Sequence, residues 1–478
     1  MLVILLLIPL LFSLSLLVFR KPATVKSISI ISSLAELVLT IYLLSQFKIA
    51  GGFQFDFNHP WISALGINFH LGIDGIGLLM LLLTNTLMPL IVLAGLKKSP
   101  ENIHQKYLLL LIAQFALNGV FISLNAFLFY IFWELSLIPV YFIILLWGGE
   151  GRQKITLKFF IYTLFGSLLM LIAFIFIYLK TPGTHSTDIN AFYHVCLEPG
   201  TQKWLFWFLF IGFAIKMPLF PFHTWQPDTY TVAPVQTTML LAGVMSKMGI
   251  FGMLRWLLPV IPWAVYQYRD MVIVFSIIGI IYGGIIALRQ KDLKKLAAYS
   301  SLAHIGLIGA SIFALNIYSL QGAMLQLFAH GINIAGFFFI IDIIEKRTYT
   351  RNVNELGGIK NVDKKLAALF MLIMLGNIAL PLTNGFIGEF LIFLGIFQYK
   401  PLMAVISGLT IIIGAVYMLY VYQKIMLGKT NEITRSFTKI DWKEMLVLTP
   451  IVILIIFFGV FPQPLIELVK NSIQGILF

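Results

Sequence analysis

The chain of 478 residues is 59% hydrophobic and only 11% charged, whereas a soluble globular protein carries about 25% charged residues. The apolar runs are long and unbroken, which excludes a transmembrane barrel built from strands of about ten residues with alternating hydrophobicity. The formal net charge is +13, but the basic residues stand in short loops between apolar runs, so it does not indicate nucleic-acid binding. Cys196 is the single cysteine, which excludes an intrachain disulfide and a thiolate-held cluster. The composition predicts an all-α polytopic membrane protein.

Apolar runs long enough to cross a bilayer predict about fourteen transmembrane helices, which we treat as one membrane domain, residues 1–478. The first run has no basic leader and no small-residue cleavage site, so we interpret it as a retained span. A last stretch, 463–478, is typical of a short amphipathic helix. In chain order the expected spans are 1–19, 25–46, 73–96, 107–124, 126–147, 156–179, 204–225, 234–258, 270–288, 296–314, 318–343, 366–399, 402–427 and 444–462.

The loops between these spans differ in charge. We name the side that holds the amino terminus side A and the opposite side B. The loops on side B hold 24 of the 33 lysines and arginines, and the loops on side A hold seven. Cytoplasmic loops carry an excess of basic residues, so side B is predicted to be cytoplasmic and both termini to lie outside. Of the two longer loops on side A, 47–72 could form a hairpin on the membrane surface, and neither it nor 180–203 suggests a catalytic domain.

The span 204–225 and the one after it contain charges and prolines. Lys216 and Lys247 stand inside apolar sequence, where each costs about 2.5–3.5 kcal/mol on insertion scales. Pro218 and Pro221 follow the first lysine, and proline removes a backbone donor, so we expect the helix to break just after Lys216. A broken helix beside a buried charge is typical of an ion or proton site inside a helix bundle.

Six titratable side chains on six different predicted helices lie near the middle of the membrane. At a rise of 1.5 Å per residue, they lie roughly 12–20 Å from the nearest span end, in a core about 30 Å thick. A buried Glu–Lys pair can be merely structural, and each histidine could be a satisfied core residue, but six such groups near one plane favour proton transfer. The six are Glu134, Lys216, Lys247, His304, His330 and Glu389.

Four other polar residues are less informative. His223 and Asp228, on the cytoplasmic side of the broken helix, are candidates for the same site but could equally be capping or loop residues. Glu36 is in the middle of its span, outside the main group, and the sequence assigns it no role. Asp74 begins the third span and is interpreted as a helix-start residue.

A repeat is suggested by two broken spans. The spans 204–225 and 366–399 are interrupted at Pro218 and at PLTNG, residues 381–385, and they lie five spans apart. An odd number of helices inverts the second copy in the membrane, and paired broken helices in inverted repeats mark ion pathways. We therefore predict two inverted five-helix repeats, about 107–258 and about 270–427.

The expected chemistry is proton transfer along these groups. Burial disfavours a charged lysine and a nearby carboxylate favours it, so such a lysine can hold or release a proton near neutral pH. We expect Glu134 to bias Lys216, and the proton to pass through Lys247 and His304 or His330 to Glu389, with water between them. The chain has no nucleotide loop, cluster ligand set or dinucleotide fingerprint, so no cofactor is expected on it and the energy must come from a partner or an ion gradient.

Four motifs carry a family resemblance. FWELSLIPVYF, AIKMPLFPFHTWQPDTYTVAP, LAGVMSKMGIFG and LTNGFIGEF resemble the antiporter-like membrane subunits of proton-pumping NADH:quinone oxidoreductase, respiratory complex I. The resemblance covers nearly the whole chain and is greatest to the M type. Ser246 departs from the pattern, because a second apolar residue is common before the lysine; little effect is expected from it.

The resemblance implies roles for particular residues. Glu134 and Lys216 would be the key channel pair, Lys247 the central relay and Glu389 the outlet, a position at which the L- and N-type relatives carry lysine. It also implies a proton-translocating subunit of the bacterial inner membrane with no redox site of its own. Its partners would be L-, N- and K/J/A-type membrane subunits, the bilayer and, indirectly, a hydrophilic redox arm.

Three rival interpretations remain. A subunit of a multi-chain sodium/proton antiporter or of a membrane-bound hydrogenase would share the fold, and neighbouring genes would separate these cases. A haem-bearing electron carrier could use His304 and His330 as axial ligands, which an absorption spectrum would reveal. A free-standing transporter would show substrate-driven uptake by the isolated chain.

Overall fold

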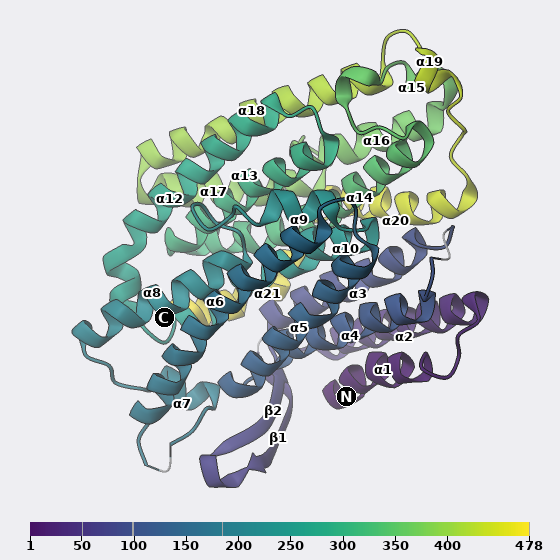
Figure 1. Ribbon diagram of the computed structural model, residues 1–478. Coiled ribbons are helices and arrows are strands. Elements are labelled where there is room, and N and C mark those ends of the chain that lie inside the picture. The colour runs from purple at the N-terminus through teal and green to yellow at the C-terminus, as the bar shows by residue number, and fades with distance from the viewer. Residues whose placement is uncertain (50, 98–99, 184, 478) are drawn as a thin grey trace.

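The computed structural model describes residues 1–49, 51–97, 100–183 and 185–477, and almost all of its regular structure is helical (Figure 1). Helices suit these apolar segments because a helix satisfies its own backbone hydrogen bonds where no water is present. The amino-terminal part contains α1 (Leu2–Ser15), α2 (Pro22–Gln46), β1 (Gln54–Ile62), a 3₁₀ turn (Ser63–Leu65), β2 (Ile67–Ile73), α3 (Gly75–Ala94), α4 (Ile103–Ile122), α5 (Ala126–Trp147), α6 (Arg152–Lys180) and α7 (Ile189–Tyr193).

The middle of the chain contains the broken helix and the most buried elements. Its segments are α8 (Pro199–Lys216), α9 (Gln226–Val232), α10 (Val235–Leu240), a π-helical turn (Leu241–Met245), α11 (Ser246–Gly252), a second π-helical turn (Met253–Leu257), α12 (Pro262–Arg289), α13 (Leu293–Phe313) and α14 (Ile317–Thr348). α14 is buried over nearly all of its length and packs against α3, α10, α13, α16, α17, α20 and α21. It therefore forms the core around which the others are arranged.

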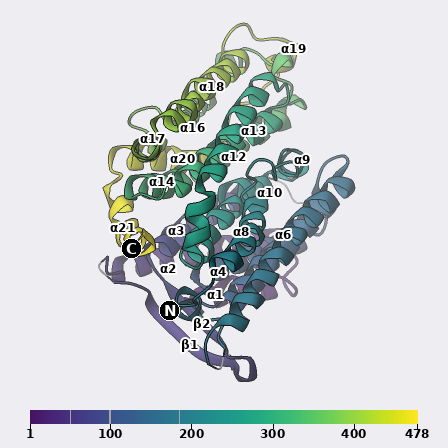
Figure 2. The same ribbon diagram turned by 90° about the vertical axis from the view of Figure 1, so that its left-hand side faces the viewer.

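The carboxy-terminal part completes the bundle. It contains a 3₁₀ turn (Val353–Glu355), α15 (Ile359–Val362), α16 (Lys364–Asn377), α17 (Asn384–Tyr399), α18 (Pro401–Met426), α19 (Glu432–Arg435), α20 (Trp442–Val460) and α21 (Gln463–Leu477). In both views α19 lies at one end of the molecule, and the hairpin and both marked chain ends lie away from it (Figures 1 and 2).

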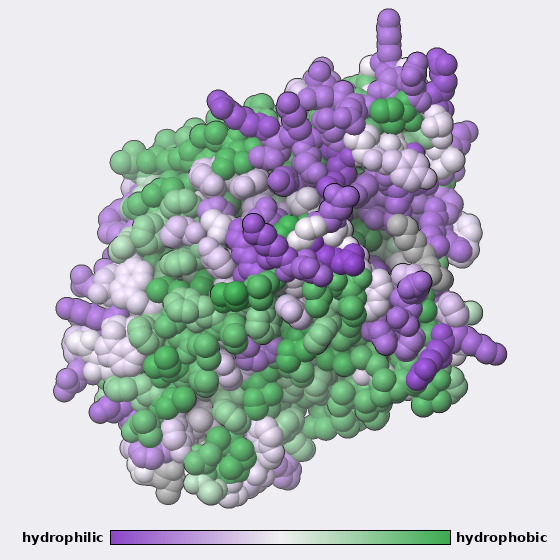
Figure 3. All heavy atoms as spheres, in the orientation of Figure 1, coloured by the Kyte–Doolittle hydropathy of each residue, from purple (hydrophilic) through white to green (hydrophobic). Residues whose placement is uncertain are grey.

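The predicted class, an all-helical polytopic membrane protein, is confirmed, with one small sheet added. Eleven helices in the described part of the chain are long and apolar enough to cross a membrane, and α1 and α17 are shorter apolar helices. Each expected span coincides with a helix or with a broken pair of helices, although the number of crossings stays a prediction. Figure 3 shows apolar side chains over the flanks of the bundle, with hydrophilic groups gathered most densely towards the end near α15 and α19.

The two predicted helix breaks are present. α8 ends at Lys216, and α9 begins only at Gln226. α16 ends at Asn377, and α17 begins at Asn384. The two proline-containing segments leave backbone groups outside the helical hydrogen-bond pattern, where they can meet polar side chains or water. The first segment begins buried at Met217, whereas Leu380, Pro381 and Leu382 of the second are exposed at the surface of the chain. The inverted repeat that these breaks suggest stays a prediction.

The hairpin expected in the loop 47–72 is present: β1 pairs antiparallel with β2, from Gln54 with Ile73 to Ile62 with Ile67. His70 fastens the hairpin to the segment before α7: its Nδ1 contacts the Asp188 carboxylate, and its Nε2 lies 2.7 Å from Oδ1 of Asp56. Burial by itself lowers the pKa of His70, but the hydrogen bonds and charges of the two aspartates outweigh it, and the pKa lies above its usual value. α21 adds a further contact, since the Gly75 N–H donates to Oγ of Ser472 at 2.9 Å.

Candidate functional site

Lys247 is completely buried on α11. It follows the π-helical turn Leu241–Met245, and its ammonium group donates to the carbonyl of Ala242 in that turn and to Oγ of Ser246 at 3.1 Å. Its third contact is Nδ1 of His330 on α14, at 2.9 Å. π-helical turns are rare and often occur at functional sites. Little effect was expected from Ser246, but its hydroxyl is one of the three groups that accept from or contact the lysine.

The contacts continue from His330 to Glu389. The rings of His330 and His304 lie 5.5 Å apart between centroids. Nδ1 of His304, on α13, lies 3.2 Å from Oε1 of Glu389 on α17. Gln326 also donates to this oxygen, at 3.0 Å. The sequence analysis left open whether His304 or His330 joins the lysine to the glutamate, and the structure places both of them, in series, between the two.

Two glycines allow this close packing. A Cβ on Gly331 of α14 would lie 2.7 Å from the carbonyl oxygen of Gly243, inside the π-helical turn. A Cβ on Gly388 of α17 would lie 2.8 Å from the backbone nitrogen of Gln326. Side chains at these positions would push α14 away from both neighbours. The absence of a side chain at Gly331 therefore allows the contact of Lys247 with His330. The absence of one at Gly388 allows the contact of Gln326 with Glu389.

Lys216, the last residue of α8, lies at the other end of the site and is buried. Its Nζ lies 3.4 Å from Oγ of Ser136 on α5 and 5.4 Å from the centroid of the Trp133 ring. The Ser136 hydroxyl also approaches the sulfur of Met248 at 3.7 Å. Met248 follows Lys247 in α11. Ser136 therefore contacts Lys216 on one side and the residue next to Lys247 on the other.

Glu134 is partly buried on α5, one residue after Trp133. Its carboxyl lies within hydrogen-bond reach of Ser167 on α6 and interacts electrostatically with Lys216. In the described residues the two do not approach to within the 4.0 Å of a direct ion pair. The two members of the predicted pair therefore lie near each other without a direct contact.

His223 and Asp228 lie apart from these groups. His223 is buried in the segment after the break and packs against the rings of Phe220 and Tyr282, with ring centroids 5.6 and 5.1 Å away. Asp228 pairs with Lys158 at 3.2 Å. These contacts attach the broken helix to its neighbours. The geometry therefore favours a structural role, as loop or capping residues, for both His223 and Asp228. A proton-carrying role for His223 stays a prediction. In the described residues no hydrogen bond or ring contact joins His223 to Lys247, His330, His304 or Glu389.

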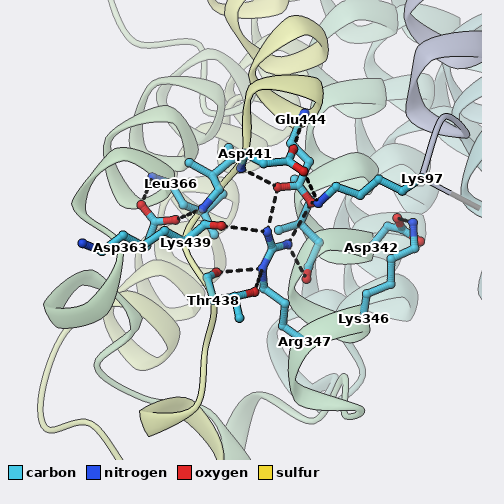
Figure 4. Close-up of polar contacts among 12 residues, drawn as sticks. Lys97, Asp342, Lys346, Arg347, Asp363, Leu366, Thr438, Lys439, Asp441 and Glu444 are labelled. Carbon is cyan, nitrogen blue, oxygen red and sulfur yellow. Dashed lines mark hydrogen bonds and ion pairs between the residues drawn. The ribbon is translucent and has the colours of Figure 1, made fainter.

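A cavity of about 860 Å³ opens at the B ends of α3, α10 and α14. Cations and carboxylates both line it, among them Lys294, Asp342 and Arg351. Beside it, Glu444 at the start of α20 accepts from Arg347 at 2.7 and 2.9 Å and lies 2.8 Å from Nζ of Lys97 (Figure 4). This ion cluster joins the B ends of α3, α14 and α20.

Several neutral polar residues in the site were missed by the sequence analysis. Ser136 and Gln326 contact charged groups directly. Buried Asn333 donates to Oδ1 of Asn384, at the start of α17, at 2.9 Å. Gln326 precedes His330 by one helical turn, so the two lie on the same face of the helix. This spacing could have indicated from the sequence that Gln326 belongs to the site. No group of three or more His, Cys, Asp or Glu residues that could hold a metal ion is found among the described residues.

Comparison with known proteins identifies the family and the fold of this chain. Residues 123–414 match the family model described as NADH:quinone oxidoreductase/Mrp antiporter, transmembrane. A relative named NADH-quinone oxidoreductase subunit M, from Rickettsia prowazekii, is 38% identical over 94% of this chain and 92% of its own length. A chain in the structure of respiratory complex I from Thermus thermophilus with bound NADH superposes with a TM-score of 0.91, at 27% identity and full coverage of both chains. A chain of the Mrp complex from Dietzia sp. DQ12-45-1b shares the fold at a TM-score of 0.87, with 17% identity and 99% coverage of both chains.

The fold and the line of buried titratable groups define a polytopic membrane protein of the antiporter-like class. The chain belongs to the NADH:quinone oxidoreductase/Mrp antiporter transmembrane family. Relatives of the chain are named NADH-quinone oxidoreductase subunit M or NADH-ubiquinone oxidoreductase chain 4, so the predicted family and its M type are confirmed.

Proposed function

We propose that this chain is the proton-translocating subunit M of a NADH:quinone oxidoreductase in a bacterial inner membrane. The proposal rests on one observation above all. Four titratable side chains from four helices, Lys247, His330, His304 and Glu389, follow one another in contact through the buried centre of the bundle. Charged and ionisable groups are costly there, and their usual reason is transport of ions or protons.

The hydrogen-bonding capacity of these groups suits proton transfer. When the Lys247 ammonium donates to Nδ1 of neutral His330, the proton of that imidazole resides on Nε2. In the described residues this Nε2 has no partner although it is buried, and one water there would connect it to the neighbouring His304 ring. Nδ1 of His304 lies 3.2 Å from Oε1 of Glu389 without hydrogen-bond geometry, and a small rotation of the ring would let it donate to that oxygen. A proton that enters at the lysine can thus leave at the carboxylate.

Glu134 and Lys216 would control the entry of protons to the relay of Lys247, His330, His304 and Glu389. With the lysine near Ser136, as here, its ammonium lies on the side of Met248 and Lys247. A swing towards Glu134 would form a direct ion pair and hold the proton away from Lys247. The two positions give a two-state element, and redox chemistry in other subunits could bias it through the helices that carry the pair.

The wider assignment follows from the family. The chain contributes to an enzyme, the oxidoreductase, and the redox site would lie in other subunits. Its partners would be L-, N- and K/J/A-type membrane subunits and, indirectly, a hydrophilic redox arm. The excess of basic residues on side B supports a cytoplasmic location for that side and a periplasmic location for both termini.

The alternative is a subunit of a multi-chain sodium/proton antiporter, which the shared fold of the Mrp chain keeps open. Sequence identity of 38% to the subunit M relative, against 17% to the Mrp chain, favours the oxidoreductase. Co-purification separates the two: quinone-reductase subunits would support the proposal, and small antiporter subunits would contradict it.

The relay is tested by replacing its central group. Lys247→Ala in the assembled complex should remove most quinone-coupled proton translocation into inverted membrane vesicles. Lys203→Ala, at an exposed lysine on side A, is the matched control and should behave as the unmodified complex. Normal translocation in Lys247→Ala would refute the relay.

A further inference from the structure

A second buried polar group lies on α2, α3 and α4, apart from the residues of the proposed relay. The outer side of α2 carries exposed apolar residues such as Leu34, Val38 and Ile41, as expected for a helix that faces lipid. Its inner side is polar and fully buried. The buried polar residues of that inner side are Ser29, Ser32, Ser33, Glu36 and Thr40.

Glu36 is the charged member of this side and is 0% exposed. One of its carboxyl oxygens, Oε2, accepts from the Asn118 amide of α4 at 2.8 Å. Hydrogen bonds then connect the three helices, because Gln114 donates to Oδ1 of Asn85 at 2.9 Å and Asn85 donates to Oγ1 of Thr40 at 2.9 Å. Thr40 donates in turn to the backbone carbonyl of Glu36, which closes the network.

The network has acceptors without donors. Within the described residues, the second carboxyl oxygen of Glu36, Oδ1 of Asn118 and Oε1 of Gln114 are buried and receive no hydrogen bond, and the hydroxyl of Ser32 has no partner. No cation in the described part of the chain forms an ion pair with Glu36, and an ionised carboxylate buried without one is very costly. One proton bound to Glu36 removes the unpaired negative charge, because a carboxylic acid is neutral. The same proton supplies one hydrogen-bond donor to the network.

One face of α4 leads from this network to the cavity on side B. Tyr107, Gln114 and Asn118 are spaced at seven and four residues, so they lie on one side of the helix. Tyr107 is buried and lines the cavity of about 860 Å³. The distance along the helix from Tyr107 to Gln114 is about 10 Å. Leu111 lies between them on the same face and packs with Tyr107 in an apolar cluster, so water can pass only when the Leu111 side chain moves aside.

We propose that Glu36, with Asn118, Gln114 and Asn85, forms a second proton-binding site in this chain, which is loaded from the cavity on side B along the Tyr107 face of α4. Loading forms one O–H bond on the carboxylate with a proton from water in the cavity, and unloading breaks that bond. The site goes beyond the proposed relay, because no described hydrogen bond joins it to Lys216, Lys247 or their partners.

Infrared spectroscopy of the assembled complex in membranes tests the proposal. The carbonyl stretch of a protonated carboxylic acid should disappear in Glu36→Gln, which keeps the shape and the acceptor for Asn118. Glu467→Gln, at an exposed carboxyl on α21, is the control and should keep the band. A band that persists in Glu36→Gln would overturn the proposal.

Two further measurements guard against a variant that fails to assemble. Asn118→Ala should keep the band but move it, since Glu36 loses its amide partner; an unmoved band would overturn the assignment. In the unmodified complex, transfer to D₂O should shift the band downward, and Tyr107→Phe should slow that shift. If the band does not shift in D₂O, the acid proton does not exchange with water and Glu36 is a structural group. If the band shifts as fast in Tyr107→Phe as in the unmodified complex, the proposed route past Tyr107 is wrong. Fading of the band when Na⁺ replaces K⁺ at constant pH would assign the site to sodium instead.

Discussion

The ammonium group of Lys247 lies 2.9 Å from Nδ1 of His330, between two helices that are buried almost throughout. The lysine has no carboxylate beside it in the described structure; its other contacts are the Ala242 carbonyl and the Ser246 hydroxyl. A proton on this lysine is therefore stabilised by neutral acceptors only, and the histidine is the one neighbour that can take it. This contact makes His330 as important to the proposed relay as the lysines.

The first prediction concerns His330. In His330→Leu we expect loss of most proton translocation, because leucine cannot accept the lysine's proton and leaves a buried ammonium without one partner. The measurement is quinone-coupled acidification of inverted vesicles, normalised to assembled complex. His70→Leu is the matched control, since His70 is also buried but lies in the β1–β2 hairpin, outside the proposed relay. Equal losses in both variants would mean that His330 acts only through stability.

The second prediction concerns the entry pair. Glu134→Ala or Lys216→Ala should abolish most proton translocation and quinone-coupled turnover while the complex still assembles. Assembly should survive because Glu134 is only partly buried and makes no direct ion pair in the described residues, so its removal leaves no close partner stranded. Near-normal turnover in either variant, measured in the same vesicles, would refute the relay.

The third prediction concerns the proposed outlet. Glu389→Lys should be milder than Glu389→Ala, because lysine can still carry a proton and Gln326 can turn its free amide oxygen towards the new ammonium. His304 then lacks its carboxylate in both variants, so the comparison isolates the ability to titrate. Translocation rates that fall equally in both would make the outlet role of Glu389 doubtful.

The fourth prediction concerns stability. Glu444 is buried and holds both Arg347 and Lys97 (Figure 4). Glu444→Ala leaves buried Arg347 without its carboxylate, whereas partly exposed Lys97 keeps Asp441 at 2.7 Å. The lost charge-assisted hydrogen bonds of Arg347 are worth about 1.5–3 kcal/mol. We expect a clear loss of thermal stability in the purified complex. Glu432→Ala, at an exposed carboxyl on side B, should leave the melting temperature unchanged; an unchanged value in Glu444→Ala would contradict the predicted role of the cluster.

Much of this fold can be predicted from the sequence because the membrane imposes simple rules. Long apolar runs require helices, and Pro218 after Lys216 predicts where α8 ends. The charged candidates are visible because a charge in apolar sequence is costly and therefore informative. The hairpin 47–72 is suggested by composition, but its attachment through His70 and Asp188 joins residues 118 apart, and no local pattern encodes that contact.

The order of groups within the site could not be predicted in the same way. Ser136, Ser246 and Gln326 are neutral and carry little insertion cost, so nothing distinguishes them from other polar residues in apolar helices. The π-helical turn before Lys247 has no signature in LAGVMSKMGIFG. Which histidine meets which partner depends on helix packing that glycines such as Gly331 and Gly388 allow, and one sequence does not reveal those pairings.

The last prediction concerns pH and the hairpin. The pKa of His70 in the folded protein is raised above its ordinary value of about 6.5, because the contacts with Asp188 and Asp56 outweigh the effect of burial. A group whose pKa is raised by folding stabilises the folded state fully at pH values below its unfolded pKa, and this contribution is lost as the pH rises through the folded pKa. The attachment of β1–β2 to the segment before α7 should therefore weaken at alkaline pH.

Limited proteolysis of the assembled complex checks this expectation. Cleavage within 47–72 should become faster as the pH rises above about 6.5, after correction for the pH dependence of the protease on an unfolded substrate. In His70→Gln, which keeps hydrogen bonding but cannot become charged, cleavage should be faster at low pH and should lose most of its pH dependence. His59→Gln, on the exposed face of the same hairpin, serves as the control and should retain the pH dependence of the unmodified chain. A pH profile in His70→Gln equal to that of the control would show that the charge of His70 does not hold the hairpin in place.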